Sequence, residues 1–210
     1  MINKLSNKIL KVNPHKIIFY SEPPNWKWFH FLDKRIKIIF VKDYLKKIAL
    51  GKMFYGGNWD IKSISFDKTH WYIQIQDLKE NISKVECSIW YKLIMEEIQK
   101  KGHYFHKKIK IKDKKQAILF FENYVLNLVQ SLNDKNFIIE NIDDIPTALI
   151  GRNGELIKSG HGCHRLAIIK SFNIKCEFPI KIIGIHKKFN LKNANEIYDY
   201  VKTNYSLKKN

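Results

Sequence analysis

The chain has 210 residues, and 45% of them are hydrophobic, which is enough for a sizeable core and excludes an intrinsically disordered protein. The formal net charge of +18 favours anionic partners, but the lysine- and isoleucine-rich composition is typical of AT-rich coding sequence, so nucleic acid is not the favoured partner. Three cysteines without Cys-x-x-Cys spacing indicate neither a disulfide framework nor a zinc site, and the absence of a long apolar run predicts a soluble, cytoplasmic protein without a membrane span.

Residues 16–20 predict a strand, and the segment Ser21-Glu22-Pro23-Pro24-Asn25 ends it. A group of aromatic residues follows, and two interpretations of it stay open. A satellite core is favoured because aromatic residues are frequent throughout the chain, and a platform for stacking nucleic-acid bases is the alternative. The residues concerned are Trp26, Trp28, Phe29 and Phe31.

The segment Gly57-Asn58-Trp59-Asp60 combines a flexible backbone with an indole and a carboxylate. A carboxylate beside an indole loses water, so Asp60 is a candidate general base or magnesium ligand. The alternative is that Asp60 caps the next turn while Trp59 packs beneath it. The residues alone favour neither interpretation.

Two amphipathic helices are predicted in the middle of the chain, over residues 88–101 and 114–133, from apolar residues at helical spacing. Gly102 ends the first helix. Both apolar stripes are typical of core-facing helices. His103 and His106 lie between the helices, but no third ligand is near them in the sequence, so we predict no metal site.

The last third of the chain contains its most distinctive loop. The pattern predicts a strand, a hairpin turn, a strand, a glycine loop, a helix and a strand, at residues 147–150, 153–154, 155–158, 159–166, 166–173 and 178–185. Gly160 and Gly162 can adopt positive φ and bring backbone N–H groups close to an anion at the start of the helix. A short amphipathic segment at 194–201 and a frayed end from Asn204 complete the chain.

Arginine use points to the same loop. Only three of the 38 basic residues are arginine, and two of them, Arg152 and Arg165, flank the glycine loop. A guanidinium can bind phosphate through two parallel hydrogen bonds, which an ammonium cannot do. We therefore predict that both arginines contact phosphate.

Gly162-Cys163-His164-Arg165, followed by an apolar helix and by Phe178-Pro179-Ile180-Lys181-Ile182, resembles the ParB/sulfiredoxin superfamily over roughly residues 142–186. The Gly-Asn-Trp-Asp segment is similar to one found in ParB-like proteins. The resemblance implies an α/β (α+β) fold, a small mixed sheet with packed helices and a nucleotide-phosphate pocket at the loop. It suggests an N-terminal extension over residues 1–86, a nucleotide-binding core over 87–190 and a C-terminal helix and tail over 191–210.

The first functional hypothesis is an ATP- or ADP-dependent phosphotransferase that acts with Mg²⁺ on a small hydroxyl compound or a glycan. The loop would hold the nucleotide and one catalytic side chain would accept the hydroxyl proton. The nucleotide-binding candidates are Gly160, Gly162, Cys163, His164, Arg165 and Arg152, and the catalytic candidates are Asp60, His161, Cys163 and His164.

Two alternatives stay open. In the first, the start of a helix and neighbouring cations lower the pKa of the Cys163 thiol, which then performs sulfiredoxin-like, ATP-dependent thiol chemistry. In the second, the protein is a nucleotide-gated DNA-binding module without enzymatic activity. Only about 24 residues follow His186, too few for the helix-turn-helix domain of ParB proteins, so DNA binding would need the N-terminal half.

Overall fold

The computed structural model describes residues 8–24, 53–107, 109–134, 144–191 and 193–207. The protein is mixed α/β, as the sequence predicts. By its internal contacts the chain divides into unit 1 (residues 1–66, 139–163 and 177–210) and unit 2 (67–138 and 164–176). These units differ from the boundaries suggested at 86 and 190, because the N-terminal strands pair with strands from the last third of the chain. The aromatic group at 26–31 lies outside the described residues.

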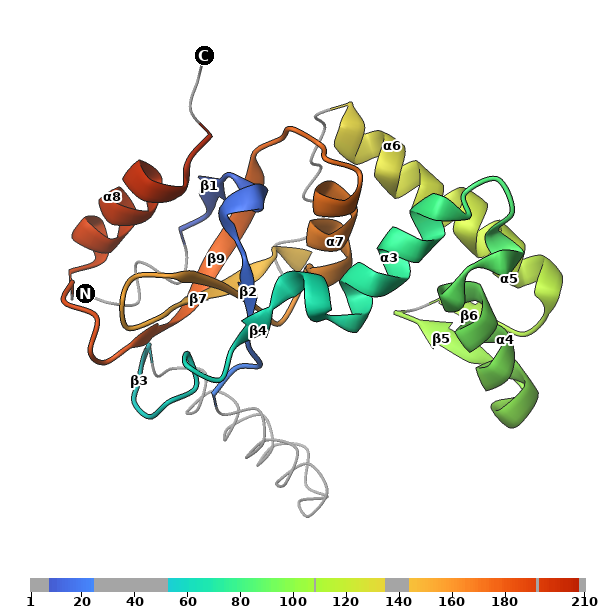
Figure 1. Cartoon of the computed structure of the whole chain (residues 1–210), viewed down its shortest axis with the longest axis horizontal. Helices are drawn as coiled ribbons and strands as arrows, with labels where there is room; N and C mark the ends of the chain where they lie inside the picture. The colour runs from blue at the N-terminus through green and yellow to red at the C-terminus, as the bar shows by residue number, and fades with distance from the viewer. Residues whose placement is uncertain (1–7, 25–52, 108, 135–143, 192, 208–210) are drawn as a thin grey trace. The chain divides into compact units, whose positions relative to one another are not determined.

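Seven described strands of unit 1 form one sheet (Figure 1). The strand order is β1-β9-β7-β8-β2-β4, and β3 also pairs with β9. The bounds are β1 Leu10–Val12, β2 Phe19–Tyr20, β3 Phe54–Tyr55, β4 Ile64–Ser65, β7 Thr147–Ile150, β8 Leu156–Ser159 and β9 Phe178–His186. The predicted strand at 16–20 is shorter than expected, because a 3-10 turn over Pro14–Lys16 precedes it.

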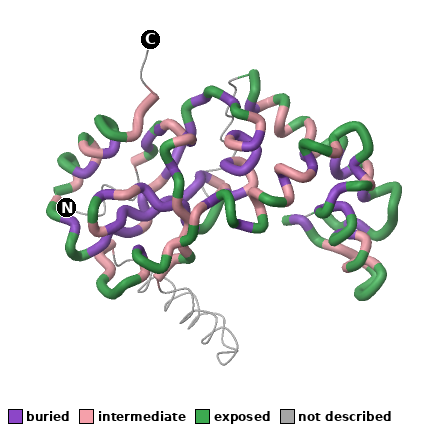
Figure 2. The backbone as a smooth tube through the Cα atoms, in the orientation of Figure 1, coloured by how far each residue is buried: buried purple, intermediate pink, exposed green. Residues whose placement is uncertain are grey.

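The β7–β8 hairpin lies in the middle of the sheet. The two strands are antiparallel to each other, while β7 is parallel to β9 and β8 is parallel to β2. All residues of β7 and β8 are buried, and Figure 2 shows the buried backbone concentrated along these central strands. The hairpin turn at Asn153-Gly154 is confirmed, with Gly154 at a φ of 88°. The core of unit 1 is therefore built around the strand that leads into the glycine loop.

Helix α8, Ala194–Tyr205, belongs to unit 1 and is longer than predicted. The helix includes Asn204 and Tyr205, where the sequence predicts a frayed end, while residues 208–210 lie outside the described residues. The contacts of Tyr205 explain why the helix extends this far. The Tyr205 hydroxyl accepts a hydrogen bond from Leu156 N at 3.0 Å and donates one to Gly154 O at 3.0 Å. The Tyr205 carbonyl also accepts a hydrogen bond from Asn13 N at 2.5 Å. These bonds fix the helix end to the hairpin and to the segment after β1.

Unit 2 is mainly helical. Its elements are α3 His70–Glu80, α4 Ile89–Lys101, β5 Tyr104–His106, β6 Ile109–Ile111, α5 Lys114–Phe120, a π-helix over Phe121–Leu126, α6 Asn127–Asn133 and α7 Cys163–Ser171, whose first residue is counted with unit 1. Short 3-10 turns lie at Phe66–Lys68 and Val85–Cys87. The prediction for α4 is confirmed: the Ser88 hydroxyl caps its start, and Gly102, at a φ of 75°, ends it.

Three features of the helices differ from the sequence prediction. The helix predicted over 114–133 contains a π-helical turn in its middle. Helix α3 was not predicted, although Thr69 caps its first turn. Helix α7 begins at Cys163 rather than at Leu166, because Gly162 adopts a φ of 89° and the chain can enter the helix at the next residue.

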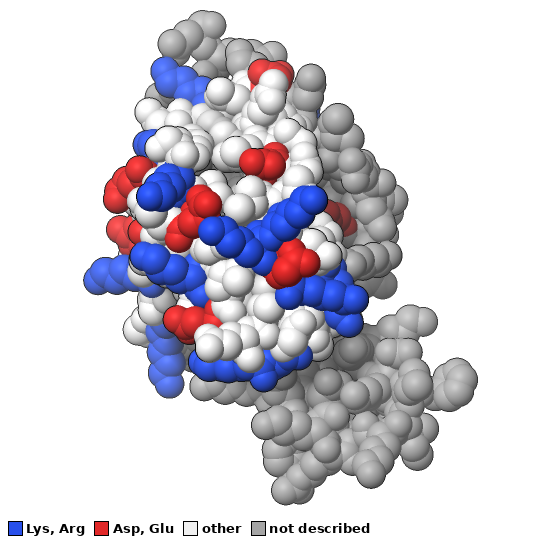
Figure 3. Space-filling view, turned by 90° about the vertical axis from the view of Figure 1, so that its right-hand side faces the viewer, with Lys and Arg blue, Asp and Glu red and all other residues white. Residues whose placement is uncertain are grey.

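Among the described residues, no helix has the length and apolar character needed to cross a bilayer. Figure 3 shows the face on the side of α4 and α5, where lysines and carboxylates are interspersed. This face therefore does not carry the continuous basic surface that nucleic-acid binding proteins use.

Candidate functional site

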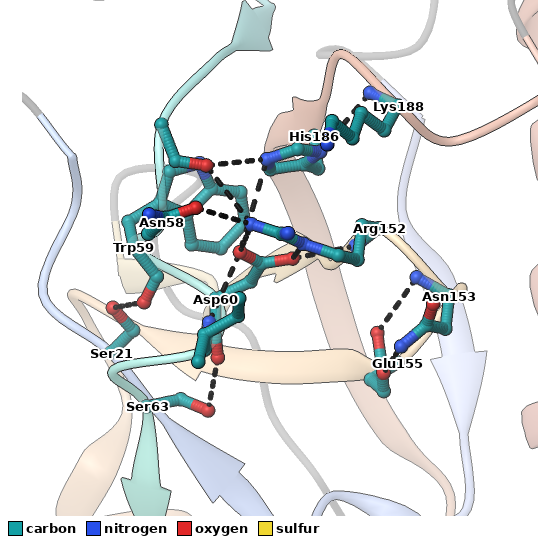
Figure 4. A network of polar contacts seen from close by, with 12 residues as sticks. Ser21, Asn58, Trp59, Asp60, Ser63, Arg152, Asn153, Glu155, His186 and Lys188 are labelled. Carbon is teal, nitrogen blue, oxygen red and sulfur yellow. Dashed lines mark hydrogen bonds and ion pairs between the residues drawn. The ribbon is translucent and has the colours of Figure 1, made fainter.

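The carboxylate of Asp60 is the centre of a polar network in unit 1 (Figure 4). Arg152 donates to it from Nε at 2.8 Å, from Nη2 at 2.9 Å and from its backbone N–H at 2.9 Å. Ile61 N donates a fourth hydrogen bond, at 3.0 Å. The Asp60 side chain is only 4% exposed. Burial raises its pKa, but the hydrogen bonds and charge of Arg152 outweigh that effect and lower the pKa to about 2.

Arg152 lies in the turn between β7 and β8, and its guanidinium has further partners in the same network. Nη2 donates to Gly57 O at 3.0 Å and to Asn58 Oδ1 at 3.1 Å. The guanidinium that the sequence assigned to phosphate is thus bound to the Gly-Asn-Trp-Asp segment. Both predicted roles, Asp60 as base and Arg152 as phosphate ligand, compete with the ion pair that the two residues form.

His186, at the end of β9, is the third member of the network. Lys188 N donates to Nδ1 at 3.0 Å, so this nitrogen is an acceptor, and Nε2 lies 2.9 Å from Gly57 O, where it donates. Nε2 is 3.8 Å from Asp60 Oδ1, and the ring centroid is 5.7 Å from that of Trp59. Sequence reasoning missed His186 as a site residue, because nothing local to it indicates a partner more than a hundred residues away.

We call the side chains of Asn58, Asp60, Arg152 and His186 the carboxylate network. It joins the Gly-Asn-Trp-Asp segment to the β7–β8 turn and to the end of β9. A carboxylate with a pKa of about 2 holds protons weakly and is a poor general base near neutral pH. The network is therefore suited to positioning the segment around Asn58 and Trp59.

The glycine loop adopts the conformation that the sequence predicts. Gly160 and Gly162 have φ values of 60° and 89°. A Cβ atom at Gly162 would lie 2.6 Å from Pro146 Cβ, and one at Gly160 would lie 2.7 Å from Thr147 Oγ1. Both positions therefore need glycine for space as well as for conformation.

Lys158, the residue before Ser159 in β8, is fully buried beneath the loop. Its ammonium donates to the carbonyl oxygens of Thr147 at 3.0 Å, Ser159 at 2.8 Å and His161 at 2.5 Å, and Gly160 O lies 3.4 Å away. Successive loop carbonyls therefore turn inward toward one cation. No local sequence pattern indicates this role, because lysine is the common cation of the chain.

Thr147 fixes the loop from the neighbouring strand. Its Oγ1 accepts a hydrogen bond from His161 N at 3.1 Å and donates one to Ser159 O. Its backbone N–H donates to His161 O at 3.1 Å. With Lys158, these bonds hold the loop in one conformation, and the His161 side chain is exposed.

Cys163 is the first residue of α7, and it corrects the thiolate prediction. Its side chain is buried and Sγ donates to Gly160 O at 3.2 Å. Burial raises the pKa of the thiol, and the nearby Lys158 only partly offsets that effect. The expected lowering of the pKa by the helix start does not occur, because loss of water dominates.

His164 and Arg165 follow in α7 and belong to unit 2. The His164 ring stacks on Trp90, with centroids 5.1 Å apart and 19° between the planes, and lies 5.3 Å from the His106 ring. Burial, then His106, His70 and Lys107, lower the pKa of His164 to about 3. The ring is therefore neutral near pH 7. Arg165 is half-buried, and its predicted contact with phosphate stays a prediction.

Unit 2 thus contains a group of packed rings, aromatic side chains and histidines, which we call the histidine cluster: Trp90, His106, Phe120, Tyr124 and His164. Burial, and to a lesser extent Lys107, lower the pKa of His106 to about 4. His106 packs in this cluster, while the His103 ring contacts Phe105. The two histidines considered as a metal-binding pair therefore have different neighbours. Within the described residues, no group of three or more metal-ligating side chains is found.

Comparisons of the chain with models of protein families, with curated proteins and with solved structures found no match. The ParB/sulfiredoxin resemblance therefore depends on the residues that carry it and stays a prediction.

Proposed function

We propose that the loop of residues 159–163 binds the phosphates of ATP or ADP together with Mg²⁺, and that the protein transfers a phosphoryl group to a small hydroxyl compound or a sugar. The observation that carries the proposal is the position of Lys158 under the loop. Its ammonium attracts the carbonyl oxygens of Ser159, Gly160 and His161 from the inner side. A buried positive charge directly beneath the loop favours an anion above it.

The backbone at the loop supports the same conclusion. Peptide groups whose carbonyls turn inward direct the N–H groups of Gly160 and Gly162 away from Lys158, while the His161 N–H is bound to Thr147 Oγ1. The positive φ of Gly162 leads the chain directly into α7. The N–H groups of the first helical turn lack intrahelical acceptors and form the positive end of the helix dipole. Phosphate oxygens bind to such groups in many nucleotide sites.

In the ATP-dependent reaction, the acceptor hydroxyl oxygen bonds to the γ-phosphorus, the bond from that phosphorus to ADP breaks, and the hydroxyl proton passes to a base. Asp60 is poorly suited to that role, because Arg152 holds its carboxylate. His161, exposed on the loop itself, is the predicted base in unit 1 that the described structure leaves accessible. Bound Mg²⁺ would neutralise phosphate charge, and phosphate oxygens and water would supply most of its ligands.

The sulfiredoxin-like alternative needs a reactive thiolate. Burial of Cys163 and the raised pKa of its thiol argue against that chemistry. Cys163→Ala should therefore retain most of the nucleotide turnover. Loss of turnover in this variant, with nucleotide affinity unchanged, would favour thiol chemistry instead.

Calorimetry with ATP, ADP, CTP and GTP, each with Mg²⁺, tests the proposal. We expect ATP or ADP to bind, and Gly162→Ala to weaken binding at least about tenfold, because a Cβ atom would displace the loop from Pro146. Gly102→Ala is a matched control, since Gly102 also has positive φ but no atom lies within 4 Å of its added Cβ.

Absence of binding by all four nucleotides would contradict the proposal. Equal losses in Gly162→Ala and Gly102→Ala would also contradict it, because the loss would then come from general strain. ADP release from ATP in the presence of a hydroxyl compound, measured with a coupled assay, tests the transfer step.

A further inference from the structure

A cavity of unit 1, of about 460 Å³, lies beside the Gly-Asn-Trp-Asp segment. Tyr20, Glu22, Pro23, Asn58, Trp59 and Lys62 are among the residues that line it. Tyr20 ends β2, so the cavity opens where this strand finishes. Trp59 and Asn58 belong to the segment that the carboxylate network holds in place. None of the roles assigned so far uses this cavity.

The cavity and the glycine loop follow the carboxyl ends of two neighbouring parallel strands. In the pairing of β2 with β8, Tyr20 lies opposite Lys158, and Ser21 N donates to Lys158 O at 3.0 Å. Ligands of open α/β sheets bind beyond the carboxyl ends of such strands. The cavity is therefore adjacent to the loop that we assign to phosphate.

The lining of the cavity fits a neutral ligand with many hydroxyl groups. The rings of Tyr20 and Trp59 provide apolar faces, against which the C–H groups of a sugar can pack. Glu22 and Lys62 supply one charge of each sign, so the pair has no net preference for an anion or a cation. Aromatic walls with a few convergent polar groups are typical of small-molecule sites.

One detail of the polar groups agrees with this class of ligand. Asn58 Oδ1 accepts a hydrogen bond from Arg152 Nη2 at 3.1 Å, which fixes the orientation of the amide. Trp59 Nε1 is buried, so the indole N–H contributes no donor to the open cavity.

We propose that this cavity is the acceptor site of the protein and that it binds a neutral polyhydroxylated compound, a sugar or a polyol. The proposal rests on the proposed function, because the loop would present the phosphoryl group to a hydroxyl of this ligand. Glu22, Asn58, Trp59 and Lys62 bind the acceptor, and Arg152 and Asp60 are positioning residues that hold Asn58 and Trp59.

Saturation-transfer NMR on the full chain, with glucose, ribose, ribitol and serine as probes, tests this assignment. We expect a signal from at least one of the three polyhydroxylated probes that persists when a non-hydrolysable ATP analogue and Mg²⁺ are added. Glu22→Ala and Lys62→Ala should weaken binding of that probe about tenfold and leave the affinity for ATP within about twofold. Both side chains are exposed, so these variants should fold. Glu196→Ala and Lys202→Ala, at exposed positions of α8, are the charge-matched controls and should change neither affinity.

The possible results separate the two proposals. ATP binding without binding of any polyhydroxylated probe would overturn the acceptor assignment and leave nucleotide binding intact. Binding of a probe without binding of any nucleotide would overturn the proposed function and keep the cavity as a sugar site. Displacement of the probe by ATP would show that the cavity holds part of the nucleotide, and a stronger signal from serine than from the three other probes would exclude a polyhydroxylated acceptor.

Discussion

Buried titratable groups occur in both the carboxylate network of unit 1 and the histidine cluster of unit 2. The two regions compensate for the lost hydration of these groups in opposite ways. In the network, Arg152 compensates the buried charge of Asp60, and the pKa of the carboxyl falls to about 2. In the cluster, His106 and His164 lie among aromatic rings, and their pKa values fall to about 4 and 3. The first region keeps a charge by pairing it, and the second avoids charge altogether.

This difference bears on catalysis. A lowered pKa alone does not identify a catalytic group. Both regions contain groups with a lowered pKa, and in neither region is such a group a good proton acceptor near neutral pH. Asp60 is committed to Arg152, and His164 is stacked on Trp90. Cys163 is also buried, and its Sγ donates to Gly160 O. Three of the four residues that the sequence suggested for catalysis are thus held by structural contacts, which directs attention to the exposed His161 and to the cavity beside Trp59.

The largest effect should come from removing the ring that organises the histidine cluster. Trp90 is 3% exposed and contacts His106, Phe120, Phe121 and His164. We expect Trp90→Ala to lower the free energy of unfolding by about 3–5 kcal/mol, as measured by urea denaturation, because it removes a large buried side chain. Leu93→Ala, at a 43% exposed position of the same helix, is the control and should cost less than about 1 kcal/mol. Similar losses in both variants would show that Trp90 does not organise a core.

A smaller loss is expected in the carboxylate network. Asp60→Asn keeps the side-chain shape but removes the charge and one acceptor from Arg152, so we expect a loss of about 2–3 kcal/mol in the same measurement. Glu177→Gln is the matched control, because it breaks the exposed ion pair with Lys11 at 3.1 Å and should cost less than about 1 kcal/mol. A loss in Asp60→Asn no greater than in the control would mean that the pair is not a stabilising feature.

Local sequence patterns predicted those parts of both regions that depend on neighbouring residues. Helix α4 can be predicted because Ser88 and Gly102 mark its ends, and the β7–β8 hairpin can be predicted from the Asn153-Gly154 turn. The positive φ of Gly160 and Gly162 follows from their place before a helix. These features are set by backbone preferences within a few residues.

The contacts that define the two regions could not be predicted in this way. Asp60 and Arg152 are 92 residues apart, and each was assigned to a ligand because its actual partner was not visible in the sequence. Lys158 looks like any of the chain's many lysines, although it is fully buried under the loop. Cys163 was expected to ionise readily from its place at a helix start, but its burial depends on the tertiary fold.

An acid titration should separate the two regions by the order in which they lose stability. A folded-state pKa below the ordinary value of 6.5 means that the unfolded chain binds more protons, so His106 and His164 reduce stability as the pH falls from about 6.5 toward 4. The contribution of Asp60 is lost only between its ordinary pKa of 3.8 and about 2. Amide NMR signals from α4 should therefore weaken at a higher pH than those from β7. Loss of the β7 signals first would contradict this order.

The smallest effect at neutral pH, and the most specific, is expected from His106→Leu. Leucine lacks an ionisable group and can fill much of the space among Trp90, Phe120 and Tyr124, so we expect a change in unfolding free energy of no more than about 1–2 kcal/mol at pH 7. Below pH 6.5 the variant should lose less stability than the wild type, because position 106 can no longer take up a proton on unfolding. The number of protons taken up on unfolding, obtained from the slope of unfolding free energy against pH, should fall by up to about one. His103→Leu, whose native ring contacts Phe105 instead of the cluster, should keep the wild-type profile. If His106→Leu also keeps that profile, His106 does not contribute to the acid sensitivity, which contradicts this prediction.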